Sequence, residues 1–256
     1  MTQLTRTQAA ELRPWFVPEE PGPLVGLHVI QTGNGTILVD RWPGPSVALI
    51  ETGGNYSLRG EPDAVEVSSL RMVVGLIDAP ERFLPLLKST FPRMAVWPRV
   101  TFELSRAPTN GHVPGASVRR LGRDDEPELR RLAPEMAWIW GTWGDAKGLA
   151  SSACAWGAFL DGRLGSVACT FFVGERYEEI GVVTEPRFRG LGLSPACAAP
   201  LCVDIRHRGR IPSWTTSPDN VASLRVAQKL GFEVARRSSL YVVGMSVPEP
   251  VRPESD

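Results

Sequence analysis

The segment EEIGVVTEPRFRGLGLS, residues 178–194, decides how this chain is expected to fold. The β-branched residues between Glu179 and Thr184 predict a strand, and Glu185-Pro186 predicts the turn that ends it. An Arg-x-x-Gly-x-Gly sequence follows, and a helix is expected from Ser194 onward. The segment therefore predicts a strand, a glycine-containing turn and a helix in close succession.

The turn has the composition of an anion-binding site. Gly190 and Gly192 allow the backbone to approach a ligand closely and to adopt positive φ. Unpaired N–H groups at a helix N-terminus, together with the helix dipole, favour a phosphate group. Arg187 and Arg189 add charge-assisted donors beside the same spot. An ordinary strand-to-helix turn can contain the same glycines, so a second signal is needed.

That second signal is a helix further along the chain. Pro218-Asp219-Asn220 predicts its start, and Lys229-Leu230-Gly231-Phe232 predicts its end. Asn220, Ser223 and Lys229 recur at spacings that place polar groups along one side of this helix.

In this order, Arg-x-x-Gly-x-Gly, Asn-x-x-Ser and Lys-x-Gly-Phe resemble motifs of the GNAT superfamily of N-acetyltransferases, whose members use acetyl-coenzyme A. The resemblance covers roughly Ser117 to Val243. It implies an α/β fold with a mixed sheet, in which an acyltransferase-like domain at residues 113–247 follows a smaller α/β domain at residues 1–112. The smaller domain is similar to the amino-terminal half of two-part GNAT proteins, which is a degenerate or partial copy. Residues 248–256 are polar and proline-rich, and we expect a disordered tail there.

The resemblance also implies which residues hold the coenzyme. Main-chain amides of the turn would hold its diphosphate, and the strand before the turn would pair with its pantetheine arm. Asn220 would hydrogen-bond that arm, and Ser223 or Lys229 would lie near the adenosine end. The expected coenzyme-binding residues are Val182, Val183, Thr184, Arg187, Phe188, Arg189, Gly190, Leu191, Gly192, Leu193, Ser194, Asn220, Ser223 and Lys229.

Transfer to an amine requires a base, because an alkyl amine with a pKa near ~10 is almost entirely protonated at neutral pH. Glu179 is the first candidate, since it shares a strand face with Gly181 and Val183 and matches the acidic position that many relatives have early in this strand. Glu178 points to the opposite face and is the second candidate. For either glutamate the alternative is a solvated charge at the start of a strand.

The proton donor for the departing thiolate is where this sequence differs from the family. Many relatives have a tyrosine seven residues after the asparagine, and this chain has Ala227 there. Tyr241, Ser217 or water would then protonate the thiolate, or the thiolate leaves unassisted.

Trp138, Trp140 and Trp143 fall in a region that lies over the acceptor site in the superfamily. The resemblance therefore implies that they line the substrate pocket. The alternative is that they fill the core or the packing between domains, because tryptophans bury large areas wherever they occur.

The remaining elements are expected from local patterns. Arg71–Ile77 and Ala95–Ser105 are expected to be strands, and Pro80–Ser89 a helix. The stretch APTNGHVPGA, residues 107–116, has the composition of a linker. Phe232–Arg236 and Leu240–Val243 are expected to form a closing hairpin.

Composition excludes several classes of protein. The 28 basic and 28 acidic side chains cancel, so no overall field would attract nucleic acid or an anionic membrane. No apolar run approaches the ~20 residues of a membrane span, and the N-terminus lacks the apolar core of a signal peptide, so a cytoplasmic protein is expected. The cysteines lack metal-ligand spacing and are expected to be reduced and buried. His28, His112 and His207 are scattered, so we expect no metal, and we expect these side chains at the surface or at helix caps.

The first functional hypothesis is an N-acetyltransferase that moves an acetyl group from acetyl-coenzyme A to a small primary amine or to an amino group of a larger acceptor. Whether it acts as a monomer or a homodimer stays open. One alternative is a non-catalytic protein that binds or senses acyl-coenzyme A, which Ala227 permits. Another is a structural or interaction protein that retains the fold.

Overall fold

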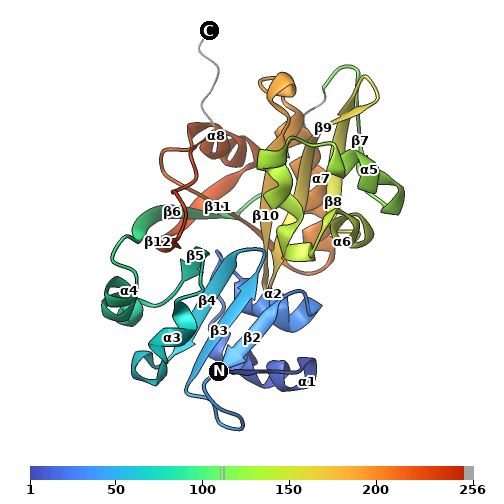
Figure 1. The fold of residues 1–256 in the computed structure, drawn as a ribbon. Helices are drawn as coiled ribbons and strands as arrows, with labels where there is room; N and C mark the ends of the chain where they lie inside the picture. Colours follow the sequence, from blue (N-terminus) through green and yellow to red (C-terminus); the bar gives the residue numbers. More distant parts are fainter. Residues whose placement is uncertain (110, 112, 251–256) are drawn as a thin grey trace.

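The computed structural model describes residues 1–109, 111 and 113–250, whose strands form one mixed sheet of twelve strands (Figure 1). The order across the sheet is β1-β2-β3-β4-β5-β12-β6-β11-β10-β9-β8-β7. The strands are β1 (Thr2–Gln3), β2 (Thr36–Val39), β3 (Val47–Thr52), β4 (Asn55–Gly60), β5 (Gly75–Asp78), β6 (Ala95–Leu104), β7 (Ala116–Arg120), β8 (Ala155–Leu160), β9 (Arg163–Val173), β10 (Tyr177–Thr184), β11 (Ile211–Thr216) and β12 (Phe232–Val243).

Helices cover both faces of this sheet. The α-helices are α1 (Arg6–Ala9), α2 (Val25–Thr32), α3 (Val67–Leu70), α4 (Leu84–Thr90), α5 (Glu126–Arg130), α6 (Ala146–Ser151), α7 (Leu193–His207) and α8 (Val221–Leu230). The 3₁₀ helices are η1 (Ala10–Phe16), η2 (Pro62–Ala64), η3 (Glu81–Phe83), η4 (Arg123–Asp125), η5 (Pro134–Trp143) and η6 (Pro186–Phe188). None of the helices in the described residues is long and apolar enough to cross a bilayer.

The two halves of the sheet repeat one pattern. β2, β3 and β4 are antiparallel, and β5 pairs with β4 in parallel. In the same way β8, β9 and β10 are antiparallel, and β11 pairs with β10 in parallel. Each parallel strand is followed along the chain by a helix, α4 or α8, and by a closing strand, β6 or β12. The repeat is what a chain built from two related halves is expected to have.

The closing strands are exchanged between the halves. β12 pairs with β5 through Tyr241↔Ile77, and β6 pairs with β11 through Phe102↔Trp214. β6 and β12 also pair with each other along most of their length. The domain boundary expected near residue 112 stays a prediction. β6 comes before residue 112 in the chain, but in the sheet it lies between β12 and β11, which both come after residue 112.

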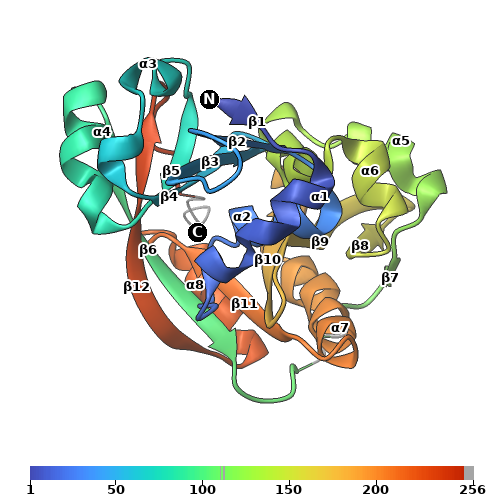
Figure 2. The same cartoon turned by 90° about the horizontal axis from the view of Figure 1, so that it is seen from below.

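The connection between the parallel strands distinguishes the halves. The chain passes from β10 to β11 through the fifteen-residue α7, but from β4 to β5 only through η2 and the four-residue α3. Fully buried residues of α7, such as Leu201 and Ile205, pack with Phe102 and Ile180 on one face of the sheet. α5 and α6 lie on the other face (Figure 2). Of the two halves, only the second therefore has a helix of several turns after the strand, in the position where an anion is expected to bind.

Two expected elements differ from the structure. The strand expected at residues 71–77 begins only at Gly75, because Arg71 and Met72 lie in an exposed turn after α3 and Gly75 has a φ of 148°. The expected closing hairpin is wrong, because β12 is one strand with a register shift between Val234 and Arg236. Pairing with β6, a long antiparallel partner, keeps the polar middle of β12 in the extended conformation.

Candidate functional site

The site is built where two parallel strands part. β10 and β11 pair only through Tyr177↔Ile211, Glu178↔Pro212 and Glu179↔Ser213, although both strands continue beyond these residues. Figure 1 shows the two strands diverging from this point. The backbone of β10 after Glu179 therefore has an edge that β11 does not occupy.

The turn after β10 leaves a group of main-chain donors free. The N–H groups of Phe188 and Arg189 donate to the carbonyls of Glu185 and Pro186, at 2.9 and 3.1 Å. Within the described part of the chain, no acceptor is found for the next five donors, which are the N–H groups of Gly190, Leu191, Gly192, Leu193 and Ser194. They precede or begin α7, where unpaired amides and the helix dipole favour an anion.

Both glycines of the turn adopt a conformation that other residues avoid. Gly190 has a φ of 78° and Gly192 a φ of 80°, and a Cβ on Gly190 would meet no heavy atom within 4 Å. The turn is thus open at Gly190, whereas a Cβ on Gly192 would lie 3.6 Å from the side chain of Val113. Phe188 and Leu193 point into the core beneath α7, so they can serve a ligand only through their backbone. Arg187 is exposed and Arg189 half-buried.

Glu179 lies where the two strands part, and it is buried without full hydrogen bonding. Only 7% of the residue is exposed, and its Oε2 atom has no partner among the described residues. Burial raises the pKa of Glu179 to about 7, while the Thr215 hydroxyl and the charges of Arg99 and Arg236 oppose part of this rise. A carboxyl with this pKa exchanges its proton near neutrality, as a general base must.

Glu178, its neighbour, is held in place by three side chains. It accepts a hydrogen bond from Thr170 at 2.6 Å and forms ion pairs with Arg208 and Arg210 at 2.6 and 3.0 Å. It is 1% exposed. Its carboxylate therefore ties β10 to the chain that leaves α7, and neither oxygen is free to accept a proton from a substrate.

Comparisons with known proteins agree with this geometry. The family model described as GNAT acetyltransferase matches residues 128–241. An uncharacterized N-acetyltransferase in the mutA 5′ region of Streptomyces virginiae is 38% identical over 211 residues, which are 80% of this chain and 89% of the relative. The chain belongs to the GNAT N-acetyltransferases.

Two further relatives extend the likeness. The uncharacterized N-acetyltransferase YdfB of Bacillus subtilis is 26% identical over 102 residues, which are 40% of this chain and 39% of the relative. A GCN5-related N-acetyltransferase-like protein from Streptococcus suis has the same fold, with a TM-score of 0.71 at 20% identity over 92% of this chain and 98% of its own. The structural likeness therefore includes the first half as well as the second.

The helix that carries the second GNAT motif uses part of that motif for itself. Asn220 caps α8, because its Oδ1 accepts the N–H of Ser223 at 3.1 Å. The hydroxyl of Ser223 accepts the indole N–H of Trp214 at 2.9 Å. Lys229 is exposed at the far end of α8, and Ala227 is fully buried in the core. Position 227 therefore faces the interior rather than the open edge of β10.

The other expected site residues are placed as follows. Tyr241 is 5% exposed and packs in an apolar cluster with Phe83 and Leu87 of the first half. Burial raises its pKa, with the negative charges of Glu81 and Asp78 adding to the rise. Val182 packs toward α7, and Val183 packs toward η5. The hydroxyl of Thr184, the last residue of β10, lies 2.7 Å from the hydroxyl of Ser194 in the first turn of α7. Ser217 is buried, with 3% of the residue exposed.

The three tryptophans of η5 have different surroundings. Trp138 is 48% exposed and lies against β10, where a Cβ on Gly181 would come within 3.3 Å of its ring. Trp140 packs in the cluster beneath η5. Trp143 donates its indole N–H to the carbonyl of Thr170 at 2.8 Å. Trp138 is thus beside the strand that carries Glu179, and the other two serve packing.

Sequence reasoning missed the residues that the strands β6, β11 and β12 bring toward Glu179. Arg99 and Thr101 come from β6, Thr215 from β11 and Arg236 from β12. The Thr101 and Thr215 hydroxyls are 3.2 Å apart, and Arg236 donates to the carbonyl of Pro21 at 2.7 Å. The one available signal was the presence of two charged residues, Arg99 and Glu103, in a strand that is otherwise mostly apolar.

His28 is a second residue that the sequence misplaced. It was expected at the surface or at a cap, but it is fully buried. Its Nε2 donates to the carbonyl of Thr142 at 2.8 Å, and its Nδ1 accepts the N–H of Val173 at 3.1 Å. Burial lowers the pKa of His28 to about 4, partly offset by the Thr142 carbonyl. A neutral imidazole therefore joins α2 to η5 and β9. His112 lies outside the described residues.

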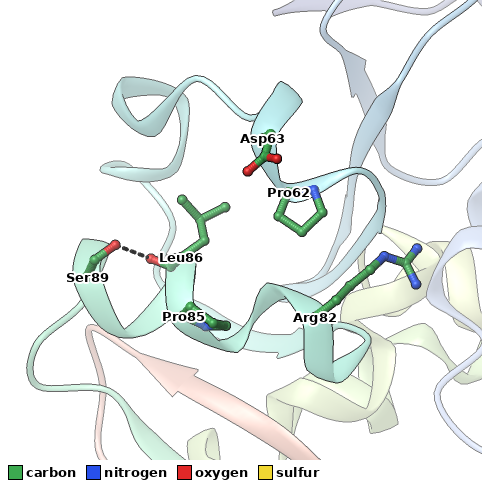
Figure 3. A pocket seen from close by; sticks show the side chains of 6 residues that line it. All are labelled: Pro62, Asp63, Arg82, Pro85, Leu86 and Ser89. Carbon is green, nitrogen blue, oxygen red and sulfur yellow. Dashed lines mark hydrogen bonds between the residues drawn. The ribbon is translucent and has the colours of Figure 1, made fainter.

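A separate hollow lies in the first half, between η2 and the segment of η3 and α4 (Figure 3). It is lined by Pro62, Asp63, Arg82, Pro85, Leu86 and Ser89. None of these residues belongs to the site on β10. No group of metal-ligating side chains occurs among the described residues.

Proposed function

We propose that this protein transfers an acetyl group from acetyl-coenzyme A to a primary amine, with Glu179 as the general base. The observation that carries the proposal is the position of Glu179: the last β10 residue paired with β11, buried, with one free oxygen and a pKa of about 7. A buried carboxylate with this pKa, placed where the open edge of β10 begins, is suited to removing a proton from an ammonium ion.

The coenzyme would bind along the edge of β10. The free N–H groups of residues 190–194 would donate hydrogen bonds to its diphosphate, because they are unpaired, close together and at the start of α7. Its pantetheine arm would pair with the backbone after Glu179, as an added strand. This places the thioester near the first unpaired residues of β10, within reach of an amine bound at Glu179.

In the reaction, the Glu179 carboxylate takes a proton from the ammonium form of the acceptor. The neutral amine then attacks the thioester carbonyl, whose oxygen would be stabilised by a main-chain N–H near Val183. The C–N bond forms, the C–S bond breaks, and the coenzyme thiolate leaves. The attacking nitrogen must also lose a second proton to become the amide. Because Ala227 faces the core and Tyr241 packs in the first half, we propose that a water molecule relays this second proton to the thiolate.

Two measurements test this function. Calorimetric titration with acetyl-coenzyme A should give saturable binding, and a panel of amines should release free thiol at a rate that depends on the protein. Binding without turnover would support the alternative, a protein that senses acyl-coenzyme A. The absence of binding would rule out both.

We also propose that the protein acts in the cytoplasm. All four cysteines, Cys154, Cys169, Cys197 and Cys202, are free, which suits a reducing compartment. Isolation of the protein with its thiols reduced in a cell fractionation experiment would support this location, and recovery from a membrane fraction would contradict it.

A further inference from the structure

A positively charged side chain that forms no direct ion pair with a described carboxylate lies close to Glu179. Arg99 is on β6, and its Nη2 donates to the carbonyl of Thr215 on β11 at 3.3 Å. Its guanidinium also lies 3.9 Å from the centre of the Trp97 ring. Thr215 is the residue whose hydroxyl acts on the pKa of Glu179. Arg99 and Glu179 therefore have Thr215 as a common neighbour, Arg99 through its carbonyl and Glu179 through its hydroxyl.

The hydrogen bonding of Arg99 is incomplete. Its Nε is enclosed and has no acceptor in the described part of the chain. Its Nη1 likewise donates to no described residue, but this atom is not enclosed. No carboxylate of the described residues lies within 4.0 Å of the guanidinium. Of the two donors without a partner, Nη1 is therefore the one that a ligand can reach.

The missing counterion is unusual for a side chain in this position. Burial lowers the pKa of Arg99 to about 10, and the more distant charges of Glu179 and Asp219 partly restore it, so the side chain is positive at neutral pH. Removing a cation from water is unfavourable unless an anion or several acceptors replace the water. The nearby Arg236 has such partners, the Pro21 carbonyl at 2.7 Å and Glu20 at 3.4 Å.

We propose, on the basis of the acetyl transfer proposed above, that Arg99 binds a carboxylate of the acceptor and that the preferred acceptors are amines carrying a carboxylate, as in an amino acid. The planar guanidinium matches a carboxylate in a two-pronged geometry that an ammonium cannot reproduce. An acceptor held this way places its amine toward Glu179, the base.

The phosphates of the coenzyme are a poor match for Arg99. The free amides of the turn begin beyond Thr184, and the five residue-to-residue steps from Glu179 to Thr184 span about 16 Å along a strand. The charge of Arg99 interacts with that of Glu179, which lies in the part of β10 away from the turn. A diphosphate at the turn would therefore be too distant, and the anion beside Arg99 belongs to the acceptor.

The test compares matched acceptors at saturating acetyl-coenzyme A, with thiol release as the readout. Each pair consists of an amino acid and its carboxamide, which differ in the negative charge. We expect kcat/KM to be at least tenfold higher for the acid. The carboxamide has the less basic amine and hence more of the reactive neutral form, so amine basicity alone would give the opposite order.

Arg99→Gln should remove this preference by raising KM for the acid at least tenfold, without changing KM for acetyl-coenzyme A. Arg237→Gln is the matched control, because it removes an exposed arginine from β12, the neighbouring strand, and should keep the preference. Should Arg99→Gln fail to fold, Arg99→Lys retains the charge and should weaken the preference only partly.

Three results would overturn the inference. The first is equal acetylation of the carboxamide and the acid by the wild-type protein. The second is a preference for the acid that persists in Arg99→Gln. The third is an effect of Arg99→Gln that falls mainly on KM for acetyl-coenzyme A. Turnover of neutral amines alone would refute the role of Arg99 and leave the acetyltransferase function standing. Loss of coenzyme binding by the wild-type protein would instead refute the function itself.

Discussion

At the scale of single residues, two adjacent glutamates differ because their partners differ. Glu178 faces the chain after α7, where Arg208 and Arg210 neutralise it, and Glu179 faces the opposite side, where one oxygen has no partner. Alternation along a strand separates the two carboxylates, and tertiary packing gives each of them different partners. The sequence ranked Glu179 first for the base, and the environment of each side chain favours that order.

Glu179→Gln should lower kcat by about 10²–10⁴-fold, the usual contribution of a general base. In the wild type, kcat should rise with pH as Glu179 loses its proton, with an inflection near its pKa of about 7. The variant should lack this inflection and keep its affinity for acetyl-coenzyme A, measured by calorimetry. Full activity of the variant would exclude Glu179 as the base.

Glu179 should also reduce stability at neutral and alkaline pH. Its pKa rises from 4.5 in the unfolded chain to about 7 in the folded protein, so the protonated form favours folding below pH 4.5 and this advantage is lost as pH rises toward 7. Glu179→Gln should therefore raise the free energy of unfolding at pH 8, on the order of 3 kcal/mol, and leave it nearly unchanged at pH 4. Urea unfolding at both pH values measures this; an equal effect at the two would contradict it.

At the scale of secondary-structure elements, the turn between β10 and α7 works through its backbone. Its side chains either point into the core or extend into solvent, while consecutive N–H groups stay free. Two glycines at positive φ make that arrangement possible without strain. The corresponding connection in the first half contains only short helices, so the repeat of the fold does not repeat the anion site.

Gly190→Ala should weaken coenzyme binding about tenfold or more, which corresponds to about 1.4 kcal/mol, because strain at a φ of 78° shifts the free amides. Gly162→Ala is the matched control. Gly162 has a φ of 72°, and a Cβ there would also meet nothing within 4 Å, but it lies in the β8–β9 turn. Both variants should lose similar stability in thermal melts. Equal coenzyme affinity in the two would contradict a role for the turn.

At the scale of the whole molecule, the halves are joined by exchanged strands and by one buried imidazole. β6 and β12 cross between the halves, and Glu19 accepts hydrogen bonds from the N–H groups of Glu175, Arg176 and Tyr177 at 2.9–3.0 Å. His28 adds a further link to the second half. The first half therefore supplies part of the environment of Glu179.

His28 should make the protein less stable in acid. Its pKa falls from 6.5 in the unfolded chain to about 4 in the folded protein, so stability is complete above pH 6.5 and decreases as pH falls toward 4. The loss is on the order of 3 kcal/mol for a fully buried group. His28→Gln should flatten this part of the stability curve in urea unfolding. His207→Gln, at an exposed position, should leave the curve as it is.

Residues 113–256 expressed alone should not fold as a stable unit. This fragment lacks β6, and with it Val100, Phe102 and Leu104 from the core beneath α7. Loss of one such phenylalanine already costs about 3–5 kcal/mol. Residues 92–256 retain β6 and should recover more of the secondary structure, as measured by circular dichroism. A cooperative melt of the shorter fragment near the temperature of the full chain would show that β6 is dispensable.

The sequence alone determined the local elements around the glycine turn of the second half, but not the single strand β12. The strand, glycine turn and helix of residues 178–194 depend on neighbouring residues, and periodicity and turn chemistry report such neighbours directly. The exchange of β6 and β12, the burial of His28 and the cluster of Arg99, Thr215 and Arg236 around Glu179 were decided only by tertiary structure. These features join residues more than 100 positions apart, and no local pattern records which distant strand completes a sheet or which charge is left without a counterion.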